Sequence, residues 1–523
     1  MRRQIPELEL FLSEGMLARF GASLIANLLR GGLTFASGIL IARGLGASSY
    51  GDLNFLLGSF VAFSQLLDMG TSSAFYTFIA KRKRGEKFFL LYMGWLSFQF
   101  VATIAVIGLL LPADALQRIW LGHDREKILL AFAASFFMTQ LWGMVSQLGE
   151  AIRQTVVVQI GASVQAIAHL ALVAAAFYWG WLNVQIVMWL LVGEYVLLAV
   201  FLGPKLTRES LAVIPGGSDG YRSVVVEFTV YCRPLLIHAW VGFLYLFADR
   251  WLLQEFGGAE QQGFFAVAQQ FANISLIATS SVLKVFWKEI AEASQQGEQE
   301  RVFHLYHKVS RGLFFTSAAM SCLLIPYSKE ILVLLVGAGY ERAWVSLVAM
   351  LFYPILQSLG QIGSIFLFAT ERTGIHASLG IGGMIASLPV TYLALAPSTA
   401  AIPGFALGAL GLSLKVVLVG ALTVGVQFYL IRRVLPAQGG WLSFLLALPL
   451  LLLLGYAAKR FSVGIISVFV VQDQFLMSLW CAVALYGICA LILLYSMPWL
   501  AGLQRYEIAR VFQLKECVIV PWK

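Results

Sequence analysis

The chain is a succession of apolar runs, each about 20 residues long and separated from the next by a short polar segment. A helix of that length crosses the hydrocarbon core of a membrane. Only 12% of the 523 residues are charged and 59% are hydrophobic, whereas soluble domains are about 25% charged, so a soluble protein is excluded. The sequence predicts an all-α polytopic membrane protein with about 14 transmembrane helices, at 20–42, 53–79, 88–111, 128–148, 155–178, 183–202, 224–247, 262–286, 309–326, 343–369, 375–395, 406–431, 441–458 and 475–497.

Basic residues are distributed unevenly between the two sides of this predicted bundle. With the amino terminus inside, 23 of the 36 Lys and Arg residues fall in inside segments, counting Arg311 at the inner end of the ninth span, 9 fall in outside segments and 4 lie elsewhere within spans. Because cytoplasmic loops are enriched in Lys and Arg, both termini are expected in the cytoplasm. The formal charge of +9 then reflects topology and attraction to membrane lipids, and it requires no nucleic-acid partner.

A short motif recurs at an offset of 212 residues, as GASSYG at 46–51 and GAEQQG at 258–263. Each copy lies between two predicted spans, the first and second or the seventh and eighth. The repeat predicts two six-helix halves of equal orientation, related by a pseudo-two-fold axis along the membrane normal; chance similarity of two turns is the alternative. The predicted domains are an N-terminal six-helix lobe, a cytoplasmic linker, a C-terminal six-helix lobe, two additional transmembrane helices and a cytoplasmic tail, at 1–202, 203–223, 224–433, 434–500 and 501–523 respectively.

Arg30 is the clearest charge within a predicted span. A charge at the centre of a membrane helix costs roughly 2.5–3.5 kcal/mol, so it usually faces a cavity or a partner. Asn27 lies three residues earlier on the same helical face, and Asp68 lies near the middle of the next predicted span. Two interpretations stay open: a structural Arg30–Asp68 ion pair, or an Arg30 that binds an anion while Asp68 positions it or exchanges protons.

Three further basic residues lie within predicted spans. Arg233 is about 13 Å inside the seventh span at 1.5 Å per residue, and Pro234, which follows it, frees a backbone carbonyl. Lys415 lies within the twelfth span, and Lys284 lies near the inner end of the eighth, from which it could reach the headgroups. Four intramembrane cations favour an anionic substrate, so Arg30, Arg233, Lys415 and Lys284 are the candidate substrate-binding residues.

Few titratable groups accompany these cations. Glu194 is the other deep carboxylate, and it is a second candidate for proton exchange. Histidine side chains ordinarily titrate near neutral pH, which makes His169 and His238 candidates for proton coupling, although a lone histidine on a helix is more often a packing residue. Together with Asn27 and Asp68, these three residues are the polar and coupling candidates. The five cysteines have no CxxC or Cys/His spacing, so no metal site is expected.

The sequence contains no GxxxxGK[ST] phosphate loop and no HExxH or GxSxG motif, so no cofactor is expected and an enzyme is disfavoured. Transport driven by a gradient is the better supported class. A membrane glycan enzyme would need an acidic site outside the bilayer. The nearest approach to one is a mixed-charge outer loop that carries Asp114, Asp124 and Glu126, which is typical of a solvated loop.

Residues 42–51 (ARGLGASSYG) and 66–70 (LLDMG) resemble the first hairpin of the bacterial polysaccharide-repeat flippases, which serve O-antigen, lipopolysaccharide and exopolysaccharide synthesis. Residues 233–235 (RPL), Asp249-Arg250 and 263–268 (GFFAVA) look like that family's seventh and eighth helices, although Tyr is commoner there at the position of Phe265. The resemblance implies membership of the multidrug/oligosaccharidyl-lipid/polysaccharide (MOP) exporter superfamily.

The resemblance also implies a mechanism and a location. Two lobes would rock about a central cavity and turn an undecaprenyl-diphosphate-linked oligosaccharide across the bacterial inner membrane. A polysaccharide polymerase and glycosyltransferases would be partners. Arginine suits this substrate, because its guanidinium donates two parallel hydrogen bonds to phosphate oxygens. A cation-coupled exporter of small amphipathic drugs and a flippase for the peptidoglycan precursor remain alternatives.

Overall fold

The structure is a computed structural model that describes residues 14–211, 220–434, 441–469 and 474–503. These residues form helices and no strand, apart from one isolated bridge between Arg84 and Leu211. Among the described residues, 12 helices are long and apolar enough to cross a membrane. Two of them, the 42-residue Asn27–Asp68 and the 54-residue Tyr221–Ile274, each include parts of two predicted spans. The all-α polytopic class is confirmed, and the count of 14 crossings stays a prediction.

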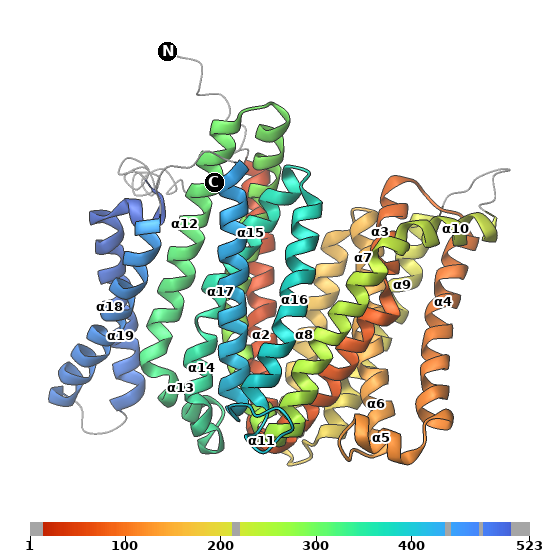
Figure 1. Ribbon diagram of the computed structural model, residues 1–523, viewed down its shortest axis with the longest axis horizontal. Coiled ribbons are helices and arrows are strands. Elements are labelled where there is room, and N and C mark those ends of the chain that lie inside the picture. The colour runs from red at the N-terminus through yellow and green to blue at the C-terminus, as the bar shows by residue number, and fades with distance from the viewer. Residues whose placement is uncertain (1–13, 212–219, 435–440, 470–473, 504–523) are drawn as a thin grey trace, which may run out of the picture. The chain divides into compact units, whose positions relative to one another are not determined.

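The chain divides into two compact units, each described here by itself. The first comprises residues 1–266 and 384–412. Its helices include α3, α7 and α9, which stand side by side (Figure 1). The elements are α2 (Glu14–Asp68), α3 (Thr71–Lys81), α4 (Glu86–Ala105), η1 (Val106–Leu110), α5 (Ala113–Ile119), α6 (Arg125–Phe136), η2 (Phe137–Leu141), α7 (Trp142–Ala151), α8 (Thr155–Tyr178), α9 (Val184–Ser210), α10 (Tyr221–Cys232), η3 (Arg233–Leu235) and parts of α11 (Leu236–Gln295), α16 (Thr373–Leu395) and α17 (Gly408–Val434).

The second unit comprises residues 267–383 and 413–523. Besides the remainders of α11, α16 and α17, it contains α12 (Gln299–Leu324), η4 (Ile325–Tyr327), α13 (Ser328–Leu335), η5 (Ala338–Ala343), α14 (Trp344–Met350), α15 (Tyr353–Ala369), α18 (Trp441–Phe469), α19 (Gln474–Ser496) and η6 (Pro498–Ala501). The division between the units runs within α11, α16 and α17, so the predicted six-plus-six lobes with a linker at 203–223 stay a prediction.

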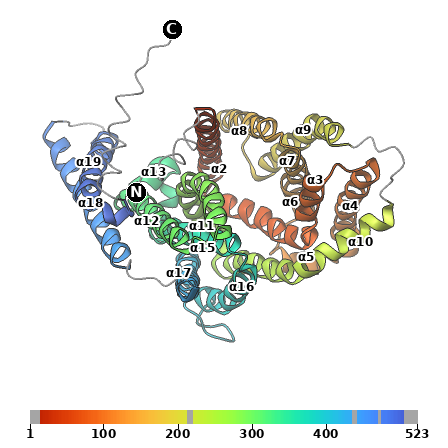
Figure 2. The same cartoon turned by 90° about the horizontal axis from the view of Figure 1, so that it is seen from above.

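The last two long helices of the second unit pack as a pair against α12. Helices α18 and α19 lie side by side (Figure 2), and both contact α12. Gly455 of α18 is packed so tightly that a β-carbon there would overlap the carbonyl oxygen of Cys322. The Tyr327 hydroxyl hydrogen bonds to Ser462 at 3.0 Å, and the Tyr486 hydroxyl donates to the carbonyl of Ala319 at 2.9 Å. The additional helices are therefore integral to the packing of this unit.

The two copies of the repeated turn adopt the same backbone conformation and touch each other within the first unit. Gly46 bends α2 with φ 74° and ψ 169°, and Gly258 bends α11 with φ 80° and ψ 175°. A left-handed φ of this kind is readily adopted by glycine alone. A β-carbon on Gly51 would overlap the carbonyl oxygen of Ala259, and one on Gly263 would overlap that of Ala47. The contact is reciprocal, as in a two-fold interface, so the turns are structural equivalents rather than a chance match.

The second predicted span is interrupted, where a continuous helix at 53–79 was expected. Helix α2 ends at Asp68, Met69 and Gly70 take left-handed φ values of 46° and 86°, and α3 begins at Thr71. Backbone groups released inside a membrane must find partners in the protein. The side chain of Gln99 donates to the carbonyl of Leu67, and that of Gln140 donates to the carbonyl of Ser64.

The seventh predicted span is interrupted as well, as its proline indicates. Helix α10 ends at Cys232, and the 3₁₀ turn η3 at Arg233–Leu235 leads into α11. The side chain of Leu235 fills the space beside Gly70, so that a β-carbon on Gly70 would overlap it. The interruptions of the two helices therefore pack directly against each other.

Candidate functional site

A polar cluster links helices α8 and α9 in the first unit. His169 Nδ1 lies 3.0 Å from both carboxylate oxygens of Glu194, and Gln165 Nε2 donates to Glu194 Oε2 at 2.9 Å. The side chains of His169 and Glu194 are 12% and 8% exposed. The structure thus brings together two residues that the sequence marked separately.

Arg30 adjoins this cluster from α2. Its Nη2 donates to Asn27 Oδ1 at 3.4 Å, one helical turn earlier, as the spacing predicted. Helix α2, which carries Arg30, packs against both α8 and α9. Arg30 is half-buried, and its one hydrogen bond among the described residues leaves most guanidinium N–H groups available. Such an arginine can donate to a phosphate oxygen.

The His169–Glu194 pair can hold a proton in two ways. With a neutral imidazole, the Nδ1–H group donates to the carboxylate; with one more proton, the pair becomes an imidazolium beside a carboxylate. Gln165 donates to the carboxylate in either case. Burial away from water strengthens these interactions. The geometry therefore holds this imidazole and this carboxylate beside each other.

Asp68 has a different role from the ones expected. Its carboxylate accepts hydrogen bonds from Ser72 N at 2.8 Å, from Gly70 N at 3.3 Å and from the Thr71 hydroxyl at 3.3 Å. These bonds satisfy the first amides of α3, which an N-terminal helix end leaves without partners. Within the part of the chain that the structure describes, Arg30 and Asp68 form no ion pair. In place of an ion pair, Arg30 bonds to Asn27 on its own helix, and Asp68 bonds to residues at the start of α3.

The remaining predicted site residues belong to other elements than α8 and α9. Arg233 begins η3 and His238 lies in α11, and both are exposed. Lys415 is in the second unit, where it is 1% exposed. Lys284 belongs to α11, but its side chain lies outside the described residues. No group of three or more metal-ligating side chains occurs among the described residues.

The sequence does not reveal an ion pair between a buried arginine and a partly exposed glutamate. Arg84, which is 1% exposed, donates through Nη1 and Nη2 to the two carboxylate oxygens of Glu227, at 2.9 and 2.7 Å. Its guanidinium also lies 5.2 and 5.0 Å from the ring centres of Phe78 and Phe88. Glu227 lies near the start of the seventh predicted span and Arg84 lies in the basic segment between the second and third spans, so neither residue stands out in the sequence as an intramembrane charge. The pair joins the segment after α3 to α10.

Comparisons with known proteins agree on one fold. A family described as "Polysaccharide biosynthesis protein" matches residues 16–286. A structure of the lipid II flippase MurJ, inward closed, is similar with a TM-score of 0.68 and 14% identity, over 90% of this chain and 98% of that one. An inward-facing multidrug resistance MATE family transporter of the MOP superfamily has a TM-score of 0.60 and 14% identity, over 79% and 98%. A MOP superfamily transporter from Pyrococcus furiosus has a TM-score of 0.55 and 14% identity, over 79% and 94%. No curated protein sequence matches the chain.

Proposed function

Because the chain belongs to the polysaccharide biosynthesis protein family, we propose that it is a flippase for lipid-linked oligosaccharides. Its substrate would be an oligosaccharide repeat unit on undecaprenyl diphosphate, moved across the bacterial inner membrane by alternating access. The glycan would then be used for surface polysaccharide synthesis, with a polymerase and glycosyltransferases as partners. Both termini would lie in the cytoplasm, as the Lys and Arg distribution predicts.

The observation that carries this proposal is the environment of Arg30. A half-buried guanidinium in a membrane-spanning helix, with Asn27 at 3.4 Å as its hydrogen-bond partner among the described residues, can bind a diphosphate. The alternative of a cationic-drug exporter calls for an available carboxylate. Glu194 is engaged by His169 and Gln165, and Asp68 by the amides of α3. The charged side chain near this cluster that can still bind a ligand is therefore the arginine.

Arg233, Lys415 and Lys284 remain proposed contributors to the same anionic path. Arg233 is the strongest of the three candidates, because its side chain is exposed at the interruption of a spanning helix. The pair His169–Glu194 is the proposed site of proton coupling, with His238 as a second titratable group. Asp68 is better explained as a structural cap.

The test is export of surface polysaccharide by cells that carry variants of the protein. Arg30→Ala should abolish export at normal protein levels, and Arg30→Lys should retain a small part, because an ammonium keeps the charge without the fork of two parallel donors. Arg222→Ala, which removes an exposed cation at the start of α10, is the matched control. Full export by a well-expressed Arg30→Ala variant would refute the role of Arg30.

Three further assays separate the proposed flippase from the alternative functions. Efflux of cationic dyes with no change in surface glycan would identify a drug exporter. Rescue of cells depleted of their peptidoglycan-precursor flippase would identify that substrate instead. Covalent change of a lipid-linked glycan by the purified protein would identify an enzyme, although Asp124 of the outer loop is engaged by Lys127 at 3.2 Å.

A further inference from the structure

A ring of three side-chain contacts joins α2, α11 and the segment at the end of α5. Trp251 Nε1 of α11 donates to the carbonyl of Ile119 at 3.1 Å. One turn later on the same face of α11, Gln254 Nε2 donates to Asp52 Oδ1 of α2 at 3.0 Å. His123 completes the ring, because its Nε2 lies 3.5 Å from the same oxygen of Asp52. All of these residues belong to the first unit.

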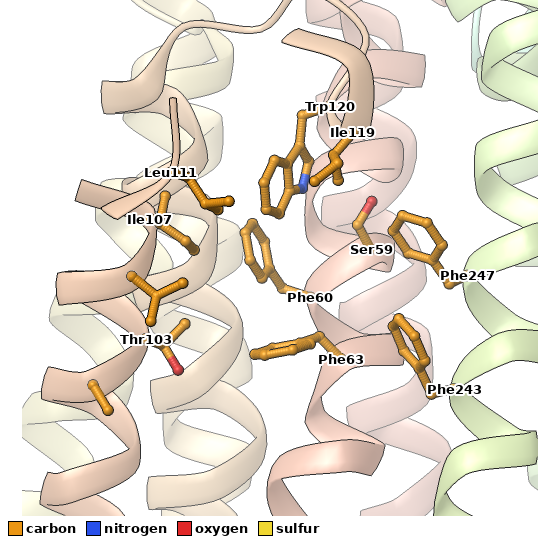
Figure 3. A pocket seen from close by; sticks show the side chains of 12 residues that line it. Ser59, Phe60, Phe63, Thr103, Ile107, Leu111, Ile119, Trp120, Phe243 and Phe247 are labelled. Atoms are coloured by element: carbon orange, nitrogen blue, oxygen red, sulfur yellow. The ribbon is translucent and has the colours of Figure 1, made fainter. Parts of the chain in front are cut away.

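The segment 119–123 is anchored on α2 at its beginning. The indole of Trp120 stacks on the ring of Phe60, with 5.5 Å between the ring centres. Figure 3 shows the indole over that ring, with Ile119 beside it. The residue is 8% exposed, so the first half of the segment is held by packing.

The second half of the segment turns sharply to bring His123 over α2. Leu121 and Gly122 take left-handed φ values of 50° and 84°. This conformation is unfavourable for leucine, and such strain persists where the surrounding structure holds the backbone in place. The imidazole of His123 stacks on the ring of Phe55, with 5.8 Å between the ring centres. The ring is therefore held at Asp52 by contacts on both sides of the turn.

The contact between His123 and Asp52 is the weak one of the three. Its 3.5 Å separation exceeds the roughly 2.7–3.2 Å of an N–H···O hydrogen bond, which the other two contacts satisfy. A neutral imidazole presents either a lone pair or an uncharged N–H group to the carboxylate. A protonated imidazole presents a charged donor, which makes a shorter and stronger bond. The strength of this one contact therefore depends on a proton.

The charges on the neighbouring elements leave Asp52 as the carboxylate that faces His123. Within α11, Asp249 accepts a hydrogen bond from Thr391 at 2.8 Å, and Arg250 lies against Gly58 of α2. The other charged groups along α2, α5, α6 and α11 near this point are exposed: Arg43, Arg118, Asp124, Arg125, Glu126 and Glu255.

The ring lies next to the contact between the repeated turns. Asp52 follows Gly51, the glycine that rests on the carbonyl of Ala259. Helix α2 belongs to the first predicted lobe and this part of α11 to the second. A movement that separates the two turns would have to break the bond between Gln254 and Asp52 as well.

We propose that residues 119–123 form a pH-responsive clasp on the contact between the repeated turns. When His123 is protonated, its Nε2–H donates to Asp52, the ring closes, and the state in which the turns touch is favoured. When His123 loses the proton, the clasp loosens and the turns separate more readily. The pH of the solution that bathes the turns thus controls this contact, whatever the protein transports.

The experiment measures the distance between the two turns with paired spin labels. Ser48→Cys and Glu260→Cys place one label on an exposed position of each turn, in full-length protein without its native cysteines, purified into lipid nanodiscs. A change from about pH 8 to about pH 5.5 spans the ordinary titration of histidine. It should raise the ratio of short to long distances about fivefold, as one added charge-assisted hydrogen bond predicts.

Two variants assign this response to the clasp. His123→Gln keeps a polar donor that does not titrate, and Asp52→Asn keeps an oxygen that accepts from Gln254; each should remove the pH response. His304→Gln is the matched control, since this histidine is 72% exposed and lies in the second unit, and it should respond as the wild type does.

A wild-type protein whose distances are independent of pH would overturn the proposal. So would a response that persists in both His123→Gln and Asp52→Asn, because another group, such as His169, would then cause it. The measurement uses no substrate, so its outcome is independent of whether the protein is a flippase.

Discussion

Arg84 and Glu227 are joined by two parallel hydrogen bonds of 2.9 and 2.7 Å, although 143 residues separate them in the sequence. Arg84 lies between α3 and α4, and Glu227 lies in α10, the start of the seventh predicted span. Two parallel hydrogen bonds make the ion pair stronger and also fix the orientation of the two side chains. The ion pair ties α10 to the segment that follows α3. The two interrupted helices, which also meet where Leu235 packs on Gly70, are therefore joined at two places.

Removal of one partner of this pair should destabilise the protein. Glu227→Ala leaves the guanidinium of Arg84 buried without its counter-ion, and we expect a loss of about 3 kcal/mol, because an uncompensated buried charge is costly. The measurement is the unfolding midpoint of purified protein in detergent. The double variant Arg84→Met/Glu227→Met should recover much of the loss. If Glu227→Ala alone matches the wild type, then the pair makes no contribution to stability.

Alanine should destabilise the protein at two glycines of the repeated turns, and it should have no such effect at a glycine elsewhere in a helix. Gly51→Ala and Gly263→Ala force a methyl group into a backbone carbonyl, so each should cost about 1–3 kcal/mol. Gly143 also lies within a helix, but nothing stands within 4 Å of a β-carbon there. Gly143→Ala should therefore be neutral or stabilise by roughly 0.5–1 kcal/mol. Equal changes in thermal stability at all three positions would contradict the contact between Gly51 and Ala259.

The interruption after Asp68 predicts a difference between two substitutions. Asp68→Asn keeps a side-chain oxygen that accepts the hydrogen bond of Ser72 N, and should change stability little. Asp68→Ala removes the acceptor and should cost about 1 kcal/mol, as at other helix N-termini. Both variants remove the charge, so an equal loss would indicate that the carboxylate charge, and not the cap, is what the fold requires.

The cluster beside Arg30 predicts separable effects on stability and transport. Glu194→Ala leaves His169 and Gln165 without their acceptor, and should cost about 1–3 kcal/mol. Glu194→Gln keeps an oxygen acceptor and should leave thermal stability nearly unchanged. If His169–Glu194 couples protons to transport, Glu194→Gln should flatten the dependence of liposome transport on the pH gradient. Wild-type dependence in this variant would rule out the coupling.

The sequence predicts the fold class well because lipid imposes one strong rule, a run of apolar residues for each crossing. The repeated turn at Gly46 and Gly258 is visible in the sequence because a positive φ combined with a ψ near 170° strongly favours glycine. The interruption at Asp68–Gly70 was hidden, because α2 and α3 form one apolar run. Arg84 was hidden in a basic loop, where hydropathy cannot distinguish a buried guanidinium from an exposed one.

The candidate site was predicted in part. Asn27 and Arg30 were joined correctly from their spacing of three residues, which is local information. Glu194 was noted for its depth and His169 as a titratable side chain, but their pairing depends on how α8 packs against α9, which no short-range pattern encodes. The similar depth of Asp68 and Arg30 left two interpretations open, an ion pair or an anion-binding Arg30 that Asp68 positions or assists by proton exchange, and the break in the helix gives the carboxylate local partners that this depth does not reveal.

The turns at 46–51 and 258–263 place a constraint on how this chain can change over time. Each turn provides the carbonyl against which the other's glycine rests, so an insertion in one turn displaces a surface that the other requires. Two segments that share a sequence pattern are thus held to one shape by mutual contact. An exchange of the two turns between their positions should consequently be tolerated better than a change in the length of either one.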